Sequence, residues 1–522
     1  MNLPDMMQYG EAYTLRSMKK SGWSARGILG VLLAGVLAAA LWTASASGQE
    51  HQPQNAPAQS SASQEQSKPE QEEPPKEEIK ITPRQAEELF HSVDEILEFD
   101  SKQTGLPIKH EVKRKLTSRD EVVSYLNQHL DDEDVQRLRR SELVLKKFGL
   151  LPRDFNLQTF MVALLREEIA GYYDPKTKTV NLLDWVPIEE QEPVMAHELT
   201  HALQDQAVGL QKWLRRGEKD LGEIKKDPTP ADIENDEMDD AREAVIEGQA
   251  QAMMLQYALA PVGKTLTDSP QLVAAMEEET LTGTPGTKVF NEAPIFMKDS
   301  LTFPYSYGME FVVKLMQKGG KEEAFAQLLR NPPHTTRQIM QPETYLSGEK
   351  IAPMAVPDFK HDFKDYQKFD IGAMGEFDVD MLVEQYAGKA LAKKMYPEWR
   401  GGYYYAARPK GDAAAPLGLL YVSRWSTADA AAEFAAVYAE SLNQRYKKAE
   451  EMGDPAQGKP SSGSAQEKSQ QDAETKVEPL HGRHVWNTDE GSVIIEVKGD
   501  TVFVSESLDA ATTAVLEKEV LK

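Results

Sequence analysis

Two histidines stand four residues apart in this chain, His197 and His201, and Glu198 directly follows the first of them. Residues four apart lie one above the other on an α-helix, so both imidazoles can reach one Zn²⁺ ion at about 2.0–2.1 Å. Glu198 then lies about 100° further round the helix, where a carboxylate can meet a water on the metal without binding the metal itself. The spacing therefore predicts a hydrolytic zinc site.

The residues around this motif indicate that it lies on a helix. Ala196, Leu199 and Leu203 repeat at the i, i+3, i+7 spacing of an apolar helical stripe. Such a helix buries one side in a core and turns its histidine side toward another element.

A catalytic zinc ion normally has three protein ligands and a water, so a third ligand must come from elsewhere. Residues 238–258 predict a second helix, on which Glu243 and Glu247 lie four apart. A glycine inside a helix costs about 1 kcal/mol relative to alanine, so Gly248 suggests a packing reason. A row of small residues beside Glu247 would let this helix approach the zinc helix closely: Ala244, Gly248 and Ala252. The alternative is that both glutamates belong to a solvated acidic face.

A hairpin is expected directly before the zinc helix. Asp174-Pro175-Lys176-Thr177 fits a type I turn between runs of aromatic and β-branched residues, from Gly171 to Leu183. An edge strand here could bind an extended peptide by strand addition, or the hairpin could only cover the core.

The two predicted helices together resemble the gluzincin group of zinc metallopeptidases. The resemblance rests on His197-Glu198-x-x-His201 and on the later Glu247-Gly248-x-Ala250. It implies that the two histidines and Glu247 bind the metal and that Glu198 is the general base. The stretches HELTHALQDQ and GYYDP also look like those of poorly characterised bacterial secreted members.

This resemblance covers residues 82–350 and is specific only over the two helices and the hairpin. The chain departs from compact members in the long charged stretch between His201 and Glu247, from Arg215 to Asp240. That departure leaves Glu243 as an alternative metal ligand, or as a hydrogen-bond partner of a histidine.

The start of a third predicted helix offers two candidates for an oxyanion donor. That helix is predicted to run from Tyr307 to Gln317, to stop at Gly319-Gly320 and to resume as far as Leu329. Tyr307, or Tyr305 before it, could donate to the oxyanion that forms when water attacks a carbonyl. The alternative is a tyrosine that only packs in the core.

Length and composition limit the classes of function. A chain of 522 residues is long for one domain, and its net charge of -25 argues against nucleic acid as a partner. The absence of cysteine excludes disulfides, a lipoprotein anchor and thiolate zinc ligands.

The N-terminal region predicts export. Residues 1–46 carry basic residues, an apolar run from Gly27 to Trp42 and an A-x-A site, which are the three parts of a signal peptide; Met18 is an alternative start. The alternative is an uncleaved membrane anchor, although the run is shorter than the ~20 residues of a usual span. Residues 47–80 are expected to form a disordered linker.

The expected fold class is α+β. Residues 81–350 should form a mainly helical zinc-metallopeptidase domain with a small antiparallel sheet. Residues 351–522 should form an accessory domain with a repeated strand-strand-helix order and a disordered insertion at 452–474. We therefore expect an extracytoplasmic Zn²⁺-dependent peptidase acting on peptides or proteins. The alternative is an inactive, metal-stabilised binding or scaffold protein of the cell envelope.

Overall fold

The computed structural model describes residues 80–122, 132–168, 171–186, 188–214, 229–271, 288–452 and 477–522. The expected export segment, nearly all of the expected linker and nearly all of the expected insertion at 452–474 lie outside these ranges. None of the helices within the described ranges is long and apolar enough to cross a membrane.

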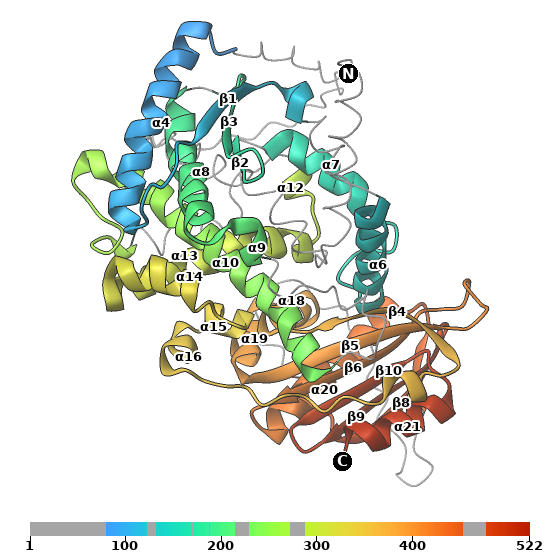
Figure 1. Ribbon diagram of the computed structural model, residues 1–522. Coiled ribbons are helices and arrows are strands. Elements are labelled where there is room, and N and C mark those ends of the chain that lie inside the picture. Colours follow the sequence, from blue (N-terminus) through green and yellow to red (C-terminus); the bar gives the residue numbers. More distant parts are fainter. Residues whose placement is uncertain are drawn as a thin grey trace, which may run out of the picture.

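The described chain is a mixed α+β structure with a helical half and a large sheet (Figure 1). The longer helices of the helical half are α4 (Pro83–Thr104), α6 (Asp132–Phe148), α7 (Leu157–Glu168), α8 (Ile188–Val208), α10 (Pro230–Leu259) and α13 (Ile295–Lys321). The shorter segments are α9 (Leu210–Leu214), η3 (Ala260–Val262), α12 (Lys288–Asn291), η4 (Glu322–Gln327), α14 (Leu328–Arg330), α15 (Thr336–Met340) and α16 (Pro342–Ser347). Helix α4 begins at a capping box, in which Thr82 and Gln85 bond reciprocally.

The small sheet consists of β1 (Lys113–Thr117), β2 (Gly171–Asp174) and β3 (Thr179–Leu183), in the order β1-β3-β2. Strands β2 and β3 pair antiparallel, which confirms the expected hairpin. The expected small antiparallel sheet is found only in part, because β1 pairs parallel to β3. Helices α6 and α7 separate β1 from the hairpin in sequence, and such a long connection allows parallel pairing. Strand β2 is therefore an edge strand of this sheet.

Two helices of the site begin earlier than their sequence patterns indicate. Helix α10 begins at Pro230 behind a capping box made by Thr229 and Asp232. Helix α13 begins at Ile295, well before the expected start at Tyr307, and continues through Pro304. The expected break is found at Gly320, whose φ of 68° is left-handed.

Helices α10 and α13 cross at two glycines. A Cβ atom added to Gly248 would lie 2.2 Å from the backbone C and O of Gly308, and one added to Gly308 would lie 2.2 Å from the backbone O of Ala244. The expectation that the small residues of α10 face the zinc helix is therefore wrong for Ala244 and Gly248. They face α13 instead, because close backbone contact needs small residues on both helices and α13 supplies Gly308.

The large sheet has seven antiparallel strands in the order β4-β5-β6-β10-β9-β8-β7. The strands are β4 (Tyr366–Ala373), β5 (Trp399–Pro409), β6 (Gly418–Trp425), β7 (Ala449–Glu451), β8 (Gly482–Thr488), β9 (Gly491–Lys498) and β10 (Thr501–Glu506). Its helical segments are α17 (Phe359–Asp362), α18 (Glu376–Ala387), α19 (Lys389–Met395), η5 (Tyr396–Glu398), α20 (Ala428–Arg445) and α21 (Ala510–Val520).

The four expected strands of this half, β5, β6, β9 and β10, form the centre of the sheet. Both faces of the sheet are covered. Alternate residues of β6 belong to different cores: Tyr421 packs in the core that contains Phe434 of α20, and Val422 in the core that contains Leu516 of α21. A strand buried on both faces loses its polar alternation, which explains the continuous apolar run in β6.

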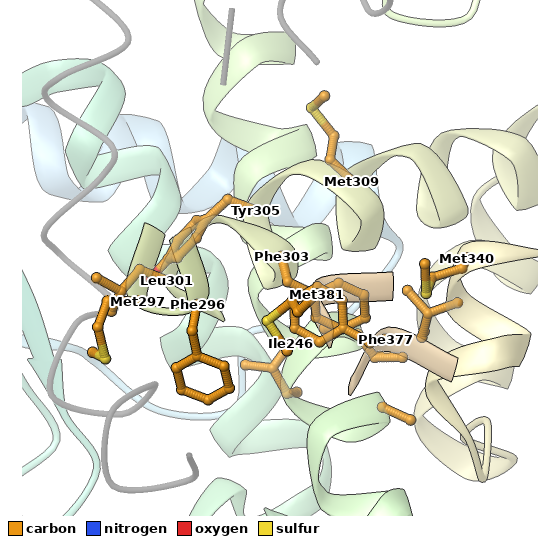
Figure 2. Packing of buried hydrophobic residues seen from close by; sticks show 14 of the residues in the cluster. Ile246, Phe296, Met297, Leu301, Phe303, Tyr305, Met309, Met340, Phe377 and Met381 are labelled. Atoms are coloured by element: carbon orange, nitrogen blue, oxygen red, sulfur yellow. The ribbon is translucent and has the colours of Figure 1, made fainter. Parts of the chain in front are cut away.

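The two halves share one core. Phe303 of α13 stacks on Phe377 of α18 with ring centroids 4.0 Å apart, and Figure 2 shows Met381 beside them. Arg337 of α15 donates to the Glu376 carboxylate at 2.7 Å, and this ion pair is buried. The helices that carry the site are therefore supported by the C-terminal half.

Candidate metal centre

Helix α8 places the two motif histidines on the side that faces α10. His197 Nε2 lies 3.2 Å from Glu247 Oε2, and His201 Nε2 lies 3.4 Å from the same oxygen. The two Nε2 atoms are 3.1 Å apart. One ligand atom from each of the three residues therefore lies within 4.8 Å of the others, and the group can hold a metal ion.

All three side chains are buried, so the charge of Glu247 has to be balanced locally. Burial alone would raise the pKa of Glu247, but His201 and His197 outweigh it and lower that pKa to about 2. Burial alone would lower the pKa of His201, but Glu247 and Glu198 raise it to about 9. These opposite pKa shifts favour a carboxylate beside a protonated imidazole when no metal is bound, and a bound cation would replace that proton.

Of the two candidate glutamates, only Glu247 joins the histidines. Glu243 is buried one turn earlier on α10 and is not a member of the group that can hold a metal ion. The arrangement has two imidazole nitrogens and one carboxylate oxygen, which is the donor set of several catalytic zinc sites.

Glu198 lies beside this group and is fully buried. Its Oε2 accepts a hydrogen bond from the backbone N–H of Tyr173 at 2.7 Å, whereas its Oε1 has no hydrogen-bond partner among the described residues. Burial, the largest effect, raises the pKa of Glu198, and the two histidines partly oppose it. One carboxylate oxygen is thus anchored and the other is available for a proton.

The contact with Tyr173 means that edge strand β2 lies directly over the histidine motif. A second residue of α8, Asp205, holds the hairpin in this place. It accepts hydrogen bonds from the Tyr173 hydroxyl and from Lys178 Nζ, both at 3.0 Å, and from the backbone N–H of Leu210 at 2.9 Å. The sequence signal for Asp205 was its position one turn after His201, but a carboxylate there does not reveal which strand it meets.

The two candidate tyrosines, Tyr305 and Tyr307, lie in different surroundings. Tyr305 is buried, its ring stacks on His197 with centroids 6.1 Å apart, and its hydroxyl donates a hydrogen bond to Glu247. Tyr307 instead packs on Phe303 at 5.5 Å and lines a small pocket with Asp299 and other residues, away from the histidines. The structure thus places Tyr305, and not Tyr307, against His197, because residues two apart on one helix point in different directions.

Two glutamines near the histidines, Gln204 and Gln249, were not predicted as site residues from the sequence. Gln204 contacts His201, and Gln249 contacts Gln204. Gln204 follows His201 at the i+3 position, which places it on the same helical side, and that spacing was the available signal.

Comparison of this chain with known protein families, with curated proteins and with solved structures gave no match.

Proposed function

We propose that this chain is a zinc-dependent peptidase of the gluzincin type. His197, His201 and Glu247 would hold the metal, which supplies Lewis-acid chemistry when bound: it acidifies water and polarises the carbonyl of the scissile bond. The observation that carries the proposal is the position of Glu198. A buried carboxylate beside the metal-binding group is suited to proton transfer when one oxygen is anchored and the other has no hydrogen-bond partner among the residues that the structure describes.

Glu198 would act twice in the reaction. Its Oε1 accepts the proton that water loses as the water oxygen bonds to the carbonyl carbon. It then delivers this proton to the amide nitrogen as the C–N bond breaks, so that an amine and a carboxylic acid leave. The raised pKa of Glu198 favours the second step, because a weaker acid holds the proton until the leaving nitrogen needs it.

Two further elements support substrate binding. Tyr305 adjoins Glu247 and His197, and its hydroxyl would donate a hydrogen bond to the developing oxyanion. Strand β2 is an edge strand above Glu198, so the main chain of an extended peptide would pair along it. The substrates would be peptides or unfolded proteins, and the N-terminal sequence suggests that they are met outside the cytoplasm.

The test compares the zinc-loaded chain with its Glu198→Gln variant on a fluorescently labelled unfolded protein. We expect cleavage that a chelator abolishes and zinc restores, and a loss of about 10²–10⁴-fold in turnover for Glu198→Gln with one zinc still bound. Glu192→Gln is a matched control on the same helix, since Glu192 bonds to Ser92 rather than to the site. Equal turnover in Glu198→Gln would refute the assignment. Zinc binding without any cleavage by the unsubstituted chain would favour the scaffold reading.

A further inference from the structure

Two buried glutamines connect His201 to the backbone of a neighbouring segment. Gln204 of α8 and Gln249 of α10 are both fully buried. The chain of hydrogen bonds runs from His201 through these two side chains to η4, a π-helical segment directly after the kink at Gly320. Each link has a donor and an acceptor, so the chain has a direction.

The direction is set at the η4 end. The side-chain nitrogen of Gln249 lies 2.7 Å from the backbone carbonyl oxygen of Ala324 and 3.3 Å from that of Phe325. A carbonyl oxygen can only accept, so the amide nitrogen of Gln249 must face η4. Its amide oxygen must then face Gln204.

The orientation of the Gln204 amide is fixed in the same way. Its side-chain nitrogen donates to Gln249 Oε1 at 2.9 Å and to the backbone carbonyl oxygen of Ile246 at 3.0 Å. Both partners can only accept, so the amide cannot flip without losing two hydrogen bonds in a buried place. Gln204 Oε1 is thus held 2.8 Å from His201 Nδ1.

An amide oxygen facing Nδ1 requires that this nitrogen carries the proton. The lone pair of a neutral His201 is then on Nε2, the atom that points to Glu247 and His197. We infer that Gln204 and Gln249 are positioning residues that impose the Nδ1–H tautomer on His201 and so prepare its Nε2 for a metal ion. This inference rests on the metal site of the proposed function.

The other histidine has no such support. His197 Nδ1 is buried and lacks a hydrogen-bond partner among the described residues. Within the described part of the chain, no protein hydrogen bond imposes the tautomer of His197 in the way that Gln204 imposes that of His201. Removal of Gln204 would leave neither histidine fixed.

Helix α8 also carries a glutamine that serves as a matched control. Gln191 is buried like Gln204, and its amide bonds to the backbone of Leu183 and Val186 rather than to the site. Gln191→Leu removes a buried amide of the same size from the same helix. It should lower stability without changing how the site binds zinc.

The experiment measures the zinc dissociation constant of the full chain by competition with a chelator. We expect Gln204→Leu to weaken zinc binding by about 10–100-fold, the usual effect of losing the hydrogen-bond partner of a metal-binding histidine. Gln249→Leu should weaken it less, because Ile246 still orients the Gln204 amide. Gln191→Leu should bind zinc like the unsubstituted chain, even if it unfolds at a lower temperature.

A second readout uses the unsubstituted chain and does not depend on any variant folding. With ¹⁵N-labelled histidine and zinc bound, NMR should show His201 with a protonated, hydrogen-bonded Nδ1 and a metal-bound Nε2. Metal-bound Nδ1 on His201 would overturn the inference. So would zinc affinity of Gln204→Leu equal to that of the unsubstituted chain or of Gln191→Leu. Failure of the unsubstituted chain to bind zinc would overturn the metal site, and this inference with it.

Discussion

The close crossing of α10 and α13 predicts that Gly248→Ala lowers the stability of the chain. Helix propensity alone would predict the opposite. Alanine at an exposed helix-interior glycine stabilises a helix by about 1 kcal/mol. At Gly248, however, the new Cβ would lie 2.2 Å from two backbone atoms of Gly308, whereas ordinary contact begins near 3.4 Å. The two helices would have to separate by about 1.2 Å, which is the difference between these distances.

Such overpacking of a filled core costs about 1–3 kcal/mol, and contact with backbone rather than with a mobile side chain belongs at the upper end. After the gain in helix propensity, Gly248→Ala should therefore lower the free energy of unfolding by about 2 kcal/mol. Gly248→Ala should also weaken zinc binding, because Glu247 adjoins Gly248 and Tyr305 lies one turn before Gly308.

Denaturant unfolding of the metal-free chain measures the first effect, and chelator competition measures the zinc affinity. Gly308→Ala is the partner variant, since its Cβ would meet the Ala244 carbonyl oxygen at 2.2 Å. The double variant should lose less than the sum of the two single losses, because helices that one alanine has already separated have room for the second. Stabilisation by Gly248→Ala, or strict additivity, would contradict this crossing.

Three further predictions concern the site and its surroundings. Glu247→Gln should abolish tight zinc binding, whereas Glu243→Gln should leave the bound zinc in place; both are measured by metal analysis after dialysis. Tyr305→Phe should lower turnover by about 10²–10³-fold at unchanged zinc content, as loss of one oxyanion donor does, and Tyr307→Phe should not. Burial and neighbouring carboxylates raise the pKa of Asp380 to about 7. Because the folded pKa lies above the unfolded value near 3.8, this group stabilises the chain fully below about pH 4 and loses that contribution as the pH rises to about 7. The free energy of unfolding of Asp380→Asn should therefore fall less between about pH 4 and about pH 7 than that of the unsubstituted chain. An equal fall in both chains would show that Asp380 is not its cause.

The sequence alone was sufficient for features that depend on local spacing. The histidines of α8 lie on one side because their separation matches a helical turn, and the hairpin before them follows from its turn residues. The α+β character likewise follows from the alternation of apolar patterns, and the capping box at Thr82 marks where α4 begins.

Features that depend on partners distant in sequence required the tertiary structure. Strand β1 is short and charged, so only its pairing with β3 defines it as a strand. The sequence of α10 alone does not show which helix its small residues contact, because the partner glycine lies on α13.

The same distinction applies within the candidate site. Helical spacing alone did not select between Glu243 and Glu247 or between Tyr305 and Tyr307, and only the resemblance of Glu247-Gly248-x-Ala250 favoured Glu247. Packing selects Glu247 and Tyr305, because the crossing of α10 with α13 turns these two toward the histidines. Spacing along one helix thus determined which residues share a side, and the tertiary structure decided which of those sides meet.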